Sequence, residues 1–437
     1  MSLLIFNGII VTLDENNNLF YPGYVFIDKN EIKSLNKGNP PSELFKEADK
    51  VINAKDKLIM PGLINAHTHA AMSMFRGLAD DLPLETWLKD FIFPVERKLV
   101  DKDFVYWGTL LAGWEMIKSG TTCLADGYFF EDEAIEACKT LGLRGILAQG
   151  VLDYPTPDVP EPKKSLINAE RFLKKWKDFS DLITPAIFAH APYTCSSETL
   201  KKAKDITRNY NTFLFIHVAE TQWEVEEIKK RYGVTPIYYL YHLGILDEKT
   251  ILIHANWISD EEISIIADTG AGIVHNPESN LKLATGLSPV PKLLSKDIPV
   301  ALGTDSAASN NNLNLFQEMD TAAKIHKGIL LDPTIMPAKT VIKMTTTIPA
   351  KMFNLNTGCL KKGALADIII IDLKHPSLFP LHNIYSLIVY SIKEAETVIV
   401  NGKIVMEKGK ITSIDTKYIK EKIFQISEKI KKFLKLS

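Results

Sequence analysis

The sequence predicts an α/β protein, in which a (β/α)8 TIM barrel is joined to a small β-sandwich domain built from both termini. Two observations support this fold class. Eight short apolar runs recur between about residues 58 and 305, with helix-like segments between them. β-Rich segments fill the first sixty residues and return after residue 362. Parallel strands that are buried on both faces have continuous apolar sequences, and eight of them close a barrel.

The eight apolar runs define the predicted barrel domain, residues 61–362. They have the length of strands, and each is followed by a segment of helical character such as "DFVYWGTLLAGWEMIKSG" or "EDEAIEACKTLGL". This alternation is typical of βα units. The runs are "LIMPGLINAH", "TTCLAD", "RGILAQGVL", "ITPAIFAHAPY", "TFLFIHVAE", "TILIHAN", "AGIVHNP" and "PVALGTD".

The two ends of the chain, residues 1–60 and 363–437, predict the β-sandwich. Turn pairs lie between β-rich runs at Asn7-Gly8, at Lys29-Asn30 and at Asn401-Gly402, and "ADIIIIDL" is a β-branched run. Residues 417–437 carry apolar side chains at helical spacing with lysines elsewhere, which favours a docked amphipathic helix over one that lies on a membrane surface.

Composition excludes several classes of protein. The 437 residues are 46% hydrophobic and 24% charged with a formal net charge of -2, so no nucleic-acid partner is expected. No apolar run approaches the length of a membrane span, and the first residues favour strands over a signal peptide. Four widely spaced cysteines without a CxxC pair argue against disulfides or a thiolate zinc site and favour the cytoplasm.

The segment "PGLINAHTHA" predicts a metal site. Side chains at positions i and i+2 of a strand point the same way, so His67 and His69 should face one side together. Neutral imidazole is a common metal ligand, although two histidines alone could equally be hydrogen-bonded polar residues at a strand end.

The other predicted strands strengthen the metal interpretation, because nearly every one ends in a polar residue. The active site of such a barrel lies at the carboxyl ends of its strands. His275 is predicted to be structural or to support a neighbouring ligand, and His242, His326, His375 and His382 to take no part. In strand order the polar residues are His67 and His69, Asp126, Gln149, His190, His217 and Glu220, His254, His275, and Asp305.

Several segments along nearly the whole chain together form a recognisable pattern. In order, they are "PGLINAHTHAAMSMFRGLADDLPLETWL", "PVERK", "HAPYTCS", "IHVAET", "HNPESNLKLATG", "LGTDSAASNNNLNLF" and "GALADIIIIDL". They resemble the amidohydrolase superfamily, and more closely its methylthioadenosine/S-adenosylhomocysteine deaminases. The resemblance implies a (β/α)8 barrel, a terminal β-sandwich, one divalent metal and homo-oligomeric assembly.

By this resemblance, His67, His69, His217 and Asp305 are the metal ligands. Three histidines and one carboxylate leave a position for water, and Zn²⁺ is the expected metal, with Fe²⁺ and Mn²⁺ as alternatives. Some related hydrolases hold two metals through a bridging lysine. No lysine ends the third or fourth predicted strand, so one metal per chain is expected.

The resemblance also implies roles in hydrolytic deamination of an adenosine-type nucleoside. Glu220 is the expected proton donor and shuttle, while His254 and Asp305 accept the proton of water. The expected substrate contacts are His190 to the purine, Glu96 to the ribose hydroxyls, Trp87 as a wall for the base and Ser309 as a weaker base contact. Glu220 and Asp305 would also contact the substrate.

Gln149 departs from the family pattern. The family has an arginine on this strand that helps to hold the carboxylate of S-adenosylhomocysteine, and a second arginine in the next loop has no clear match here. Lys163, Lys164, Arg171 or a neighbouring subunit could substitute, while Arg144 lies at the wrong end of the strand. We therefore predict a preference for neutral 5′ groups, as in methylthioadenosine, 5′-deoxyadenosine or adenosine.

Two other functions remain open from the sequence. The first is a related deaminase or chlorohydrolase that acts on guanine, a pterin or a triazine. Glu220 favours aromatic deamination, and Glu96 favours a nucleoside. The second is a non-catalytic scaffold on the same fold, which would be expected to lack metal ligands.

Overall fold

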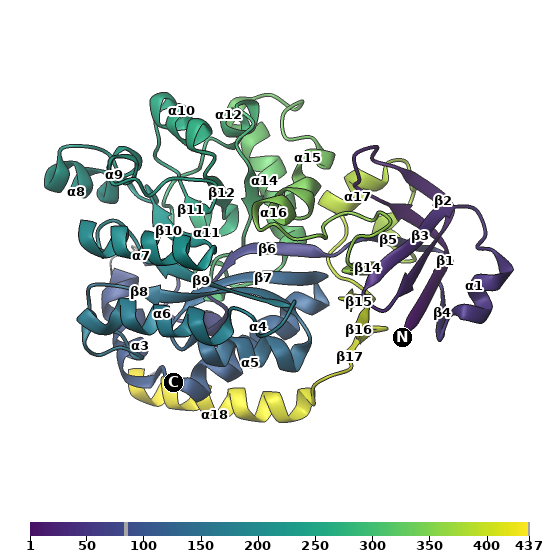
Figure 1. Cartoon of the computed structure of the whole chain (residues 1–437), viewed down its shortest axis with the longest axis horizontal. Helices are drawn as coiled ribbons and strands as arrows, with labels where there is room; N and C mark the ends of the chain where they lie inside the picture. Colours follow the sequence, from purple (N-terminus) through teal and green to yellow (C-terminus); the bar gives the residue numbers. More distant parts are fainter. Residues whose placement is uncertain (83–85, 436–437) are drawn as a thin grey trace.

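The computed structural model describes the whole chain except residues 83–85 and 436–437. It contains an eight-stranded parallel sheet and a second, nine-stranded sheet beside it (Figure 1). The strands of the first sheet are β6 (Leu63–Thr68), β7 (Thr121–Tyr128), β8 (Arg144–Val151), β9 (Ile183–Ala189), β10 (Leu214–Val218), β11 (Thr250–His254), β12 (Gly272–His275) and β13 (Val300–Leu302).

The parallel sheet curls into a barrel whose first and last strands meet. Neighbouring strands pair in sequence order from β6 to β13. At the meeting point the backbone N–H of Asp305 donates to the carbonyl of His67 at 3.1 Å. A Cβ at Gly303 would lie 2.8 Å from the backbone nitrogen of His67, so glycine is what lets the two ends approach. Each of the eight predicted runs supplies one barrel strand, which confirms the predicted (β/α)8 fold.

The first apolar run serves both sheets. Its first half is β5 (Lys57–Pro61) of the nine-stranded sheet, and its second half is barrel strand β6. Gly62 separates them, and a Cβ at this position would lie 2.2 Å from the side chain of Thr122. The chain therefore passes directly from one sheet into the other where only glycine fits.

The nine-stranded sheet is built from both termini, as predicted. It folds over its own apolar core, in which Ile5 and Val25 meet Ile368 and Ile399. Its order is β17-β16-β15-β14-β5-β1-β2-β3, with β4 paired to β1. The bounds are β1 (Ser2–Val11), β2 (Leu19–Asp28), β3 (Glu31–Lys37), β4 (Lys50–Asn53), β14 (Ile368–Asp372), β15 (Thr397–Val400), β16 (Lys403–Glu407) and β17 (Lys410–Ile411).

One predicted turn is wrong. Asn7-Gly8 does not connect two strands but forms a bulge within β1, where the pairing with β2 shifts register and Asn7 has a φ of 66°. Before the bulge β1 pairs with β4, and after it with β5. An Asn-Gly pair supplies positive φ for a bulge as readily as for a turn, and only the partner strands decide. The turns at Lys29-Asn30 and Asn401-Gly402 are confirmed as hairpins β2–β3 and β15–β16.

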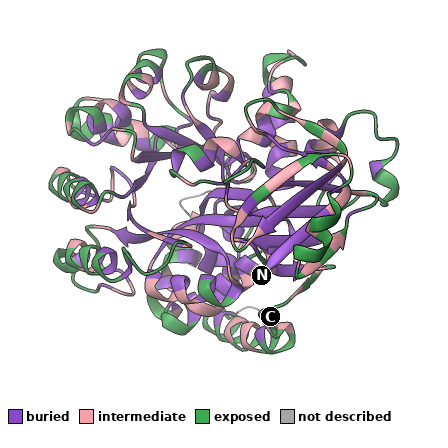
Figure 2. Cartoon of the chain, turned by 45° about the vertical axis from the view of Figure 1, so that its right-hand side comes forward, coloured by how far each residue is buried: buried purple, intermediate pink, exposed green. Residues whose placement is uncertain are grey.

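Helices cover the outside of the barrel, with buried inner faces and exposed outer faces (Figure 2). Among the helices that lie in the chain between β6 and β13, or just after β13, are α4 (Lys102–Lys118), α5 (Glu131–Leu141), α6 (Ser165–Trp176), α7 (Ser197–Tyr210), α8 (Gln222–Tyr232), α9 (Pro236–His242), α10 (Asp260–Thr269), α11 (Pro277–Lys282), α12 (Val290–Ser295), α13 (Ala307–Asn310) and α14 (Leu315–Leu330). Shorter or peripheral helices are α1 (Ser42–Glu47), η1 (Ala70–Phe75), η2 (Trp87–Ile92), α3 (Phe93–Leu99), η3 (Pro162–Lys164), α15 (Ala338–Lys343), α16 (Thr347–Met352), η4 (Pro376–Leu378) and α17 (Ile384–Tyr390).

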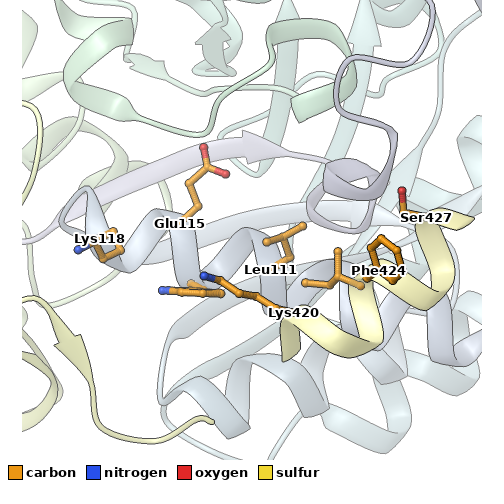
Figure 3. A pocket seen from close by; sticks show the side chains of 8 residues that line it. Leu111, Glu115, Lys118, Lys420, Phe424 and Ser427 are labelled. Carbon is orange, nitrogen blue, oxygen red and sulfur yellow. The ribbon is translucent and has the colours of Figure 1, made fainter. Parts of the chain in front are cut away.

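The predicted C-terminal amphipathic helix is confirmed as α18 (Thr416–Leu434), which packs along α4 (Figure 1). Ile419 and Ile430 are buried. Between the two helices lies a largely apolar groove, where the ammonium of Lys420 is 5.6 Å from the ring centre of Trp114 (Figure 3). Among the helices that the structure describes, none has the length and apolarity that a membrane crossing needs.

A buried ion pair joins the two sheets. Arg144, at the start of β8, donates to Asp367 just before β14, with 2.8 Å between Nε and Oδ2. Arg144 thus lies at the end of the barrel opposite the strand tips, as the sequence predicted. The division of the chain into domains at residues 60 and 362 stays a prediction.

Candidate metal centre

Three histidines converge at the carboxyl ends of the barrel strands. His67 lies near the end of β6, His69 directly follows that strand and His217 lies in β10. One nitrogen of each ring lies within 4.8 Å of the others. Asp305, which follows β13, places its Oδ1 at 3.5 Å from the Nε2 atoms of both His67 and His69. The structure thus brings all four predicted metal ligands together.

Backbone carbonyls orient two of these imidazoles. The carbonyl of Gly127, in β7, accepts from Nδ1 of His69 at 2.5 Å, and the carbonyl of His190 accepts from Nδ1 of His217 at 3.0 Å. A carbonyl can only accept, so Nδ1 carries the proton in both rings and Nε2 keeps its lone pair. These contacts are the kind that fix metal-ligating histidines.

The arrangement fits a divalent cation. The Nε2 of His67 is buried and has no hydrogen-bond partner among the described residues. Burial lowers the pKa of His67 to about 4 and also lowers the pKa values of His69 and His217, so all three rings are neutral near pH 7. Burial opposes ionisation of Asp305, but its contacts with His67 and His69 outweigh this and hold its pKa well below the usual range. Neutral imidazoles and an ionised carboxylate are the donor set that a cation such as Zn²⁺ requires.

Two serine hydroxyls hold the other oxygen of Asp305. Ser279, in α11, donates to Oδ2 at 2.6 Å, and Ser309, in α13, donates to the same atom at 3.0 Å. Oδ1 is thereby left to face the histidines. The sequence did not single out Ser279, although it lies in the "HNPESNLKLATG" segment. Ser309 as a contact of the base stays a prediction.

Glu220 and His254 lie beside the four predicted ligands. Oε2 of Glu220 is 3.8 Å from Nε2 of His254, at the tips of neighbouring strands β10 and β11. Glu220 reaches this place because the chain turns at Ala219, whose φ is 49°. The carboxylate of Glu224 accepts the backbone N–H groups of both Ala219 and Glu220 and so holds the turn. Burial raises the pKa of Glu220, which favours its protonated form.

Backbone strain is concentrated at the same strand ends. His254, Ala255 and Asp305 have φ angles of 72°, 48° and 56°, a region that non-glycine residues rarely adopt. Such conformations persist where the surrounding structure enforces them, and they are common at functional sites.

His190 and Glu96 lie near this centre from other sides. The ring of His190 is centred 5.2 Å from that of His217, and its Nδ1 is 2.9 Å from the Thr194 hydroxyl. Glu96, in α3, is buried and accepts a hydrogen bond from the hydroxyl of Tyr128 at 2.6 Å. Burial raises the pKa of Glu96 to about 7. The sequence missed Tyr128, although it stands two residues after Asp126 at the tip of β7.

The remaining sequence candidates have partners within the chain. Trp87 is buried, and its indole N–H donates to the carbonyl of Leu78 at 3.2 Å. Asp126 accepts the backbone N–H of Ala70. His275 is paired with His326, with 3.3 Å between their Nε2 atoms, so His326, which was predicted to take no part, is a buried neighbour of His275. The role of Trp87 as a wall for the base stays a prediction.

Gln149 has an acidic neighbour. It is buried at the tip of β8, and its Nε2 donates to Oδ2 of Asp158 at 2.8 Å. Asp158 lies in the loop after β8. In the segment that follows β8, the sequence had pointed only to lysines and an arginine that could bind the substrate's carboxylate. Lys164 is paired with Glu161, and Arg171 with Asp132.

A parallel barrel with three imidazoles and a carboxylate at its strand tips is the architecture of a metal-dependent barrel enzyme. The chain belongs to the amidohydrolase family, whose model matches residues 58–405. This confirms the family resemblance that the sequence motifs predicted.

Individual relatives agree with the family assignment. The chain is 41% identical over 433 residues to a 5-methylthioadenosine/S-adenosylhomocysteine deaminase of Syntrophobacter fumaroxidans, covering 98% of each chain. It is 41% identical to a 5′-deoxyadenosine deaminase of Methanocaldococcus jannaschii, over 92% of this chain and 96% of that one. A crystal structure of an adenosine deaminase from Xanthomonas campestris with bound zinc superposes with a TM-score of 0.94, at 31% identity and 98% coverage of both chains.

Proposed function

We propose that this protein is a hydrolytic deaminase of adenosine-type nucleosides, which converts the 6-amino group to a carbonyl and releases ammonia. The substrates would be 5′-methylthioadenosine, 5′-deoxyadenosine, adenosine and S-adenosylhomocysteine. The observation that carries the proposal is the position of Glu220 and His254 beside the cluster of His67, His69, His217 and Asp305. The names of the relatives support the same class of substrate.

The four-residue cluster would hold one divalent metal per chain. Its donor set fits Zn²⁺ best, with Fe²⁺ and Mn²⁺ as alternatives. When bound, such an ion supplies Lewis acidity that makes water a nucleophile near neutral pH. His254 and Asp305 would accept the proton that the attacking water loses. Asp305 is suited to this because its second oxygen is held by Ser279 and Ser309.

Glu220 would donate a proton to the ring nitrogen beside the attacked carbon, where negative charge develops. Its raised pKa favours the protonated carboxyl that this step needs. The carboxylate left behind can take a second proton and pass it to the departing amine. One water is consumed, one carbon–nitrogen bond breaks, and the products are the inosine analogue and ammonia.

Other residues would bind the nucleoside. His190 would hydrogen-bond the purine, and Glu96, held by Tyr128, would accept hydrogen bonds from the ribose hydroxyls. Trp87, Gln149 and Ser309 are proposed to complete the pocket. Homo-oligomeric assembly and a cytoplasmic location also stay predictions.

A substrate panel tests the proposal. Zinc-loaded protein is mixed with the four nucleosides and with guanine, a pterin and a triazine, and the absorbance change from amine to carbonyl is followed. Turnover of the nucleosides above all others is the expected result. A preference for guanine, a pterin or a triazine would assign the protein to another branch of the family, and absence of any turnover with metal bound would favour a scaffold.

A further inference from the structure

A chain of hydrogen bonds runs from His254 to the backbone of Glu220 through two asparagines that are buried among the described residues. Nδ1 of His254 is 2.8 Å from Oδ1 of Asn280. Nδ2 of Asn280 donates to Oδ1 of Asn256 at 2.9 Å, and Nδ2 of Asn256 donates to the carbonyl of Glu220 at 3.0 Å. The chain thus begins and ends at the two residues that face each other beside the metal cluster.

The end of this chain fixes its direction. The backbone carbonyl of Glu220 has no proton, so Asn256 must present its NH₂ group there and its oxygen to Asn280. Asn280 must then present its NH₂ group to Asn256 and its oxygen to His254. An acceptor at 2.8 Å requires a proton on Nδ1 of His254, since two lone pairs at this distance would repel each other.

Three further contacts, made by Asn276 and Thr285, leave this direction unchanged. Nδ2 of Asn276 lies 3.4 Å from Nδ1 of His254, a longer distance than that to Asn280. The hydroxyl of Thr285 lies 3.4 Å from Nδ2 of Asn256 and 3.5 Å from Oδ1 of Asn280, and it can donate to the second while it accepts from the first. The shorter contacts therefore define the network.

The backbone holds the same arrangement. The N–H groups of Asn256 and Trp257 both donate to the carbonyl of Ala219 at 3.0 Å, which ties the turn after β11 to the turn after β10. Ala219, His254 and Ala255 all have positive φ in these turns. The histidine and the glutamate are thus held at a fixed separation by main chain as well as by side chains.

We propose that Asn280 and Asn256 are positioning residues that set the tautomer of His254, with the proton on Nδ1 and the lone pair of Nε2 facing the site. Nε2 is 3.8 Å from Glu220, which is too long for a hydrogen bond and leaves Nε2 free to accept a proton from water. The catalytic meaning of this tautomer rests on the proposed deaminase function, but the tautomer itself does not.

Two variants at one position test the role of Asn280 in turnover. Asn280→Leu removes the acceptor, so kcat should fall roughly 10- to 100-fold with KM and metal content unchanged, the usual cost of losing an orienting contact. Asn280→Asp keeps an acceptor for Nδ1–H and should recover much of the loss. Asn312→Leu is the control for losing a side-chain amide, because the amide of Asn312 donates to Glu278 and Asn310 and not to His254. It should leave kcat unchanged. Wild-type kcat in Asn280→Leu, or equal losses in both Asn280 variants, would overturn the proposal.

The tautomer can be measured without turnover. Zinc-loaded protein with ¹⁵N-labelled histidine is examined by NMR, and the signals of His254 are identified by their absence in His254→Gln. We expect the proton on Nδ1 in the wild-type protein. A proton on Nε2 would refute the inference even if the enzyme is active, while a proton on Nδ1 in a protein that deaminates nothing would uphold the tautomer and refute the proposed function.

Discussion

Nε2 of Gln149 donates a hydrogen bond to Oδ2 of Asp158 at 2.8 Å, at the tip of the third barrel strand. The family resemblance places an arginine for the substrate's carboxylate at this strand. Here the position is neutral, its nearest charged partner is an acid, and two candidate replacements, Lys164 and Arg171, are paired with other acids. The structure therefore presents a neutral amide at this position, and the preference for neutral 5′ groups stays a prediction.

We predict that kcat/KM for S-adenosylhomocysteine is roughly 10- to 100-fold below that for methylthioadenosine, because a charge-assisted hydrogen bond contributes about 1.5–3 kcal/mol. Asp158→Asn should narrow the difference by removing the repelling charge, whereas Asp178→Asn, at an exposed site, should not. The kcat/KM values for S-adenosylhomocysteine and for methylthioadenosine are measured for the wild-type protein and each variant in one buffer. Equal or better turnover of S-adenosylhomocysteine by the wild-type protein would contradict this reading of Gln149.

Removal of the metal should abolish deamination, and Zn²⁺ should restore it. The expectation follows from the convergence of His67, His69, His217 and Asp305. Metal analysis should give about one equivalent per chain. His67→Asn should lose the metal, while His242→Asn, at an exposed helix end, should keep it. Full turnover after verified chelation would exclude a metal-dependent reaction.

Glu220→Gln should keep the metal but lose at least roughly 10²-fold in kcat, since general acid–base groups contribute 10²–10⁴-fold. The amide has the shape of the carboxyl but cannot deliver a proton. Single-turnover rates and metal content are measured together. Glu226→Gln, on the exposed side of α8, is the matched control. Near wild-type rates in metal-loaded Glu220→Gln would show that the proton comes from elsewhere.

Glu96→Ala should weaken turnover of nucleosides far more than that of free adenine. A carboxylate that accepts the two ribose hydroxyls would contribute about 1.5–3 kcal/mol for each hydrogen bond, and the free base has no ribose. Tyr128→Phe should also lower kcat/KM more for nucleosides than for free adenine, but by a smaller factor, because Tyr128 only holds Glu96 in place. Equal losses of kcat/KM for nucleoside and base would indicate a structural role instead.

Glu96 should also make stability depend on pH. Burial raises its pKa from 4.5 to about 7, so the folded protein binds a proton that the unfolded chain releases in this range. The contribution of protonated Glu96 to the free energy of unfolding is therefore fully present below about pH 4.5. It is lost as the pH rises to 7, by an amount on the order of 3 kcal/mol. Relative to Glu96→Gln, the wild-type protein should lose thermal stability across this interval. The exposed Glu43→Gln should track the wild type, and a Glu96→Gln curve parallel to the wild type would refute the shift.

The sequence by itself determined the features that depend on local periodicity. Eight apolar runs became eight barrel strands, and the i, i+2 spacing of His67 and His69 placed both rings on one side, because strand geometry fixes the direction of each side chain. Polar residues at the ends of parallel strands had to meet at one end of the barrel, so the four predicted ligands came together.

Only the tertiary structure decided the contacts between segments far apart in the chain. Asn7-Gly8 became a bulge because β1 exchanges one partner strand for another at that point. Ser279 on Asp305, Asn280 on His254 and Asp158 on Gln149 are contacts made by loops and short helices, whose paths no periodic pattern specifies. Strand patterns therefore predict which side chains form the centre, while the loops that pack around it decide how each one is oriented and charged.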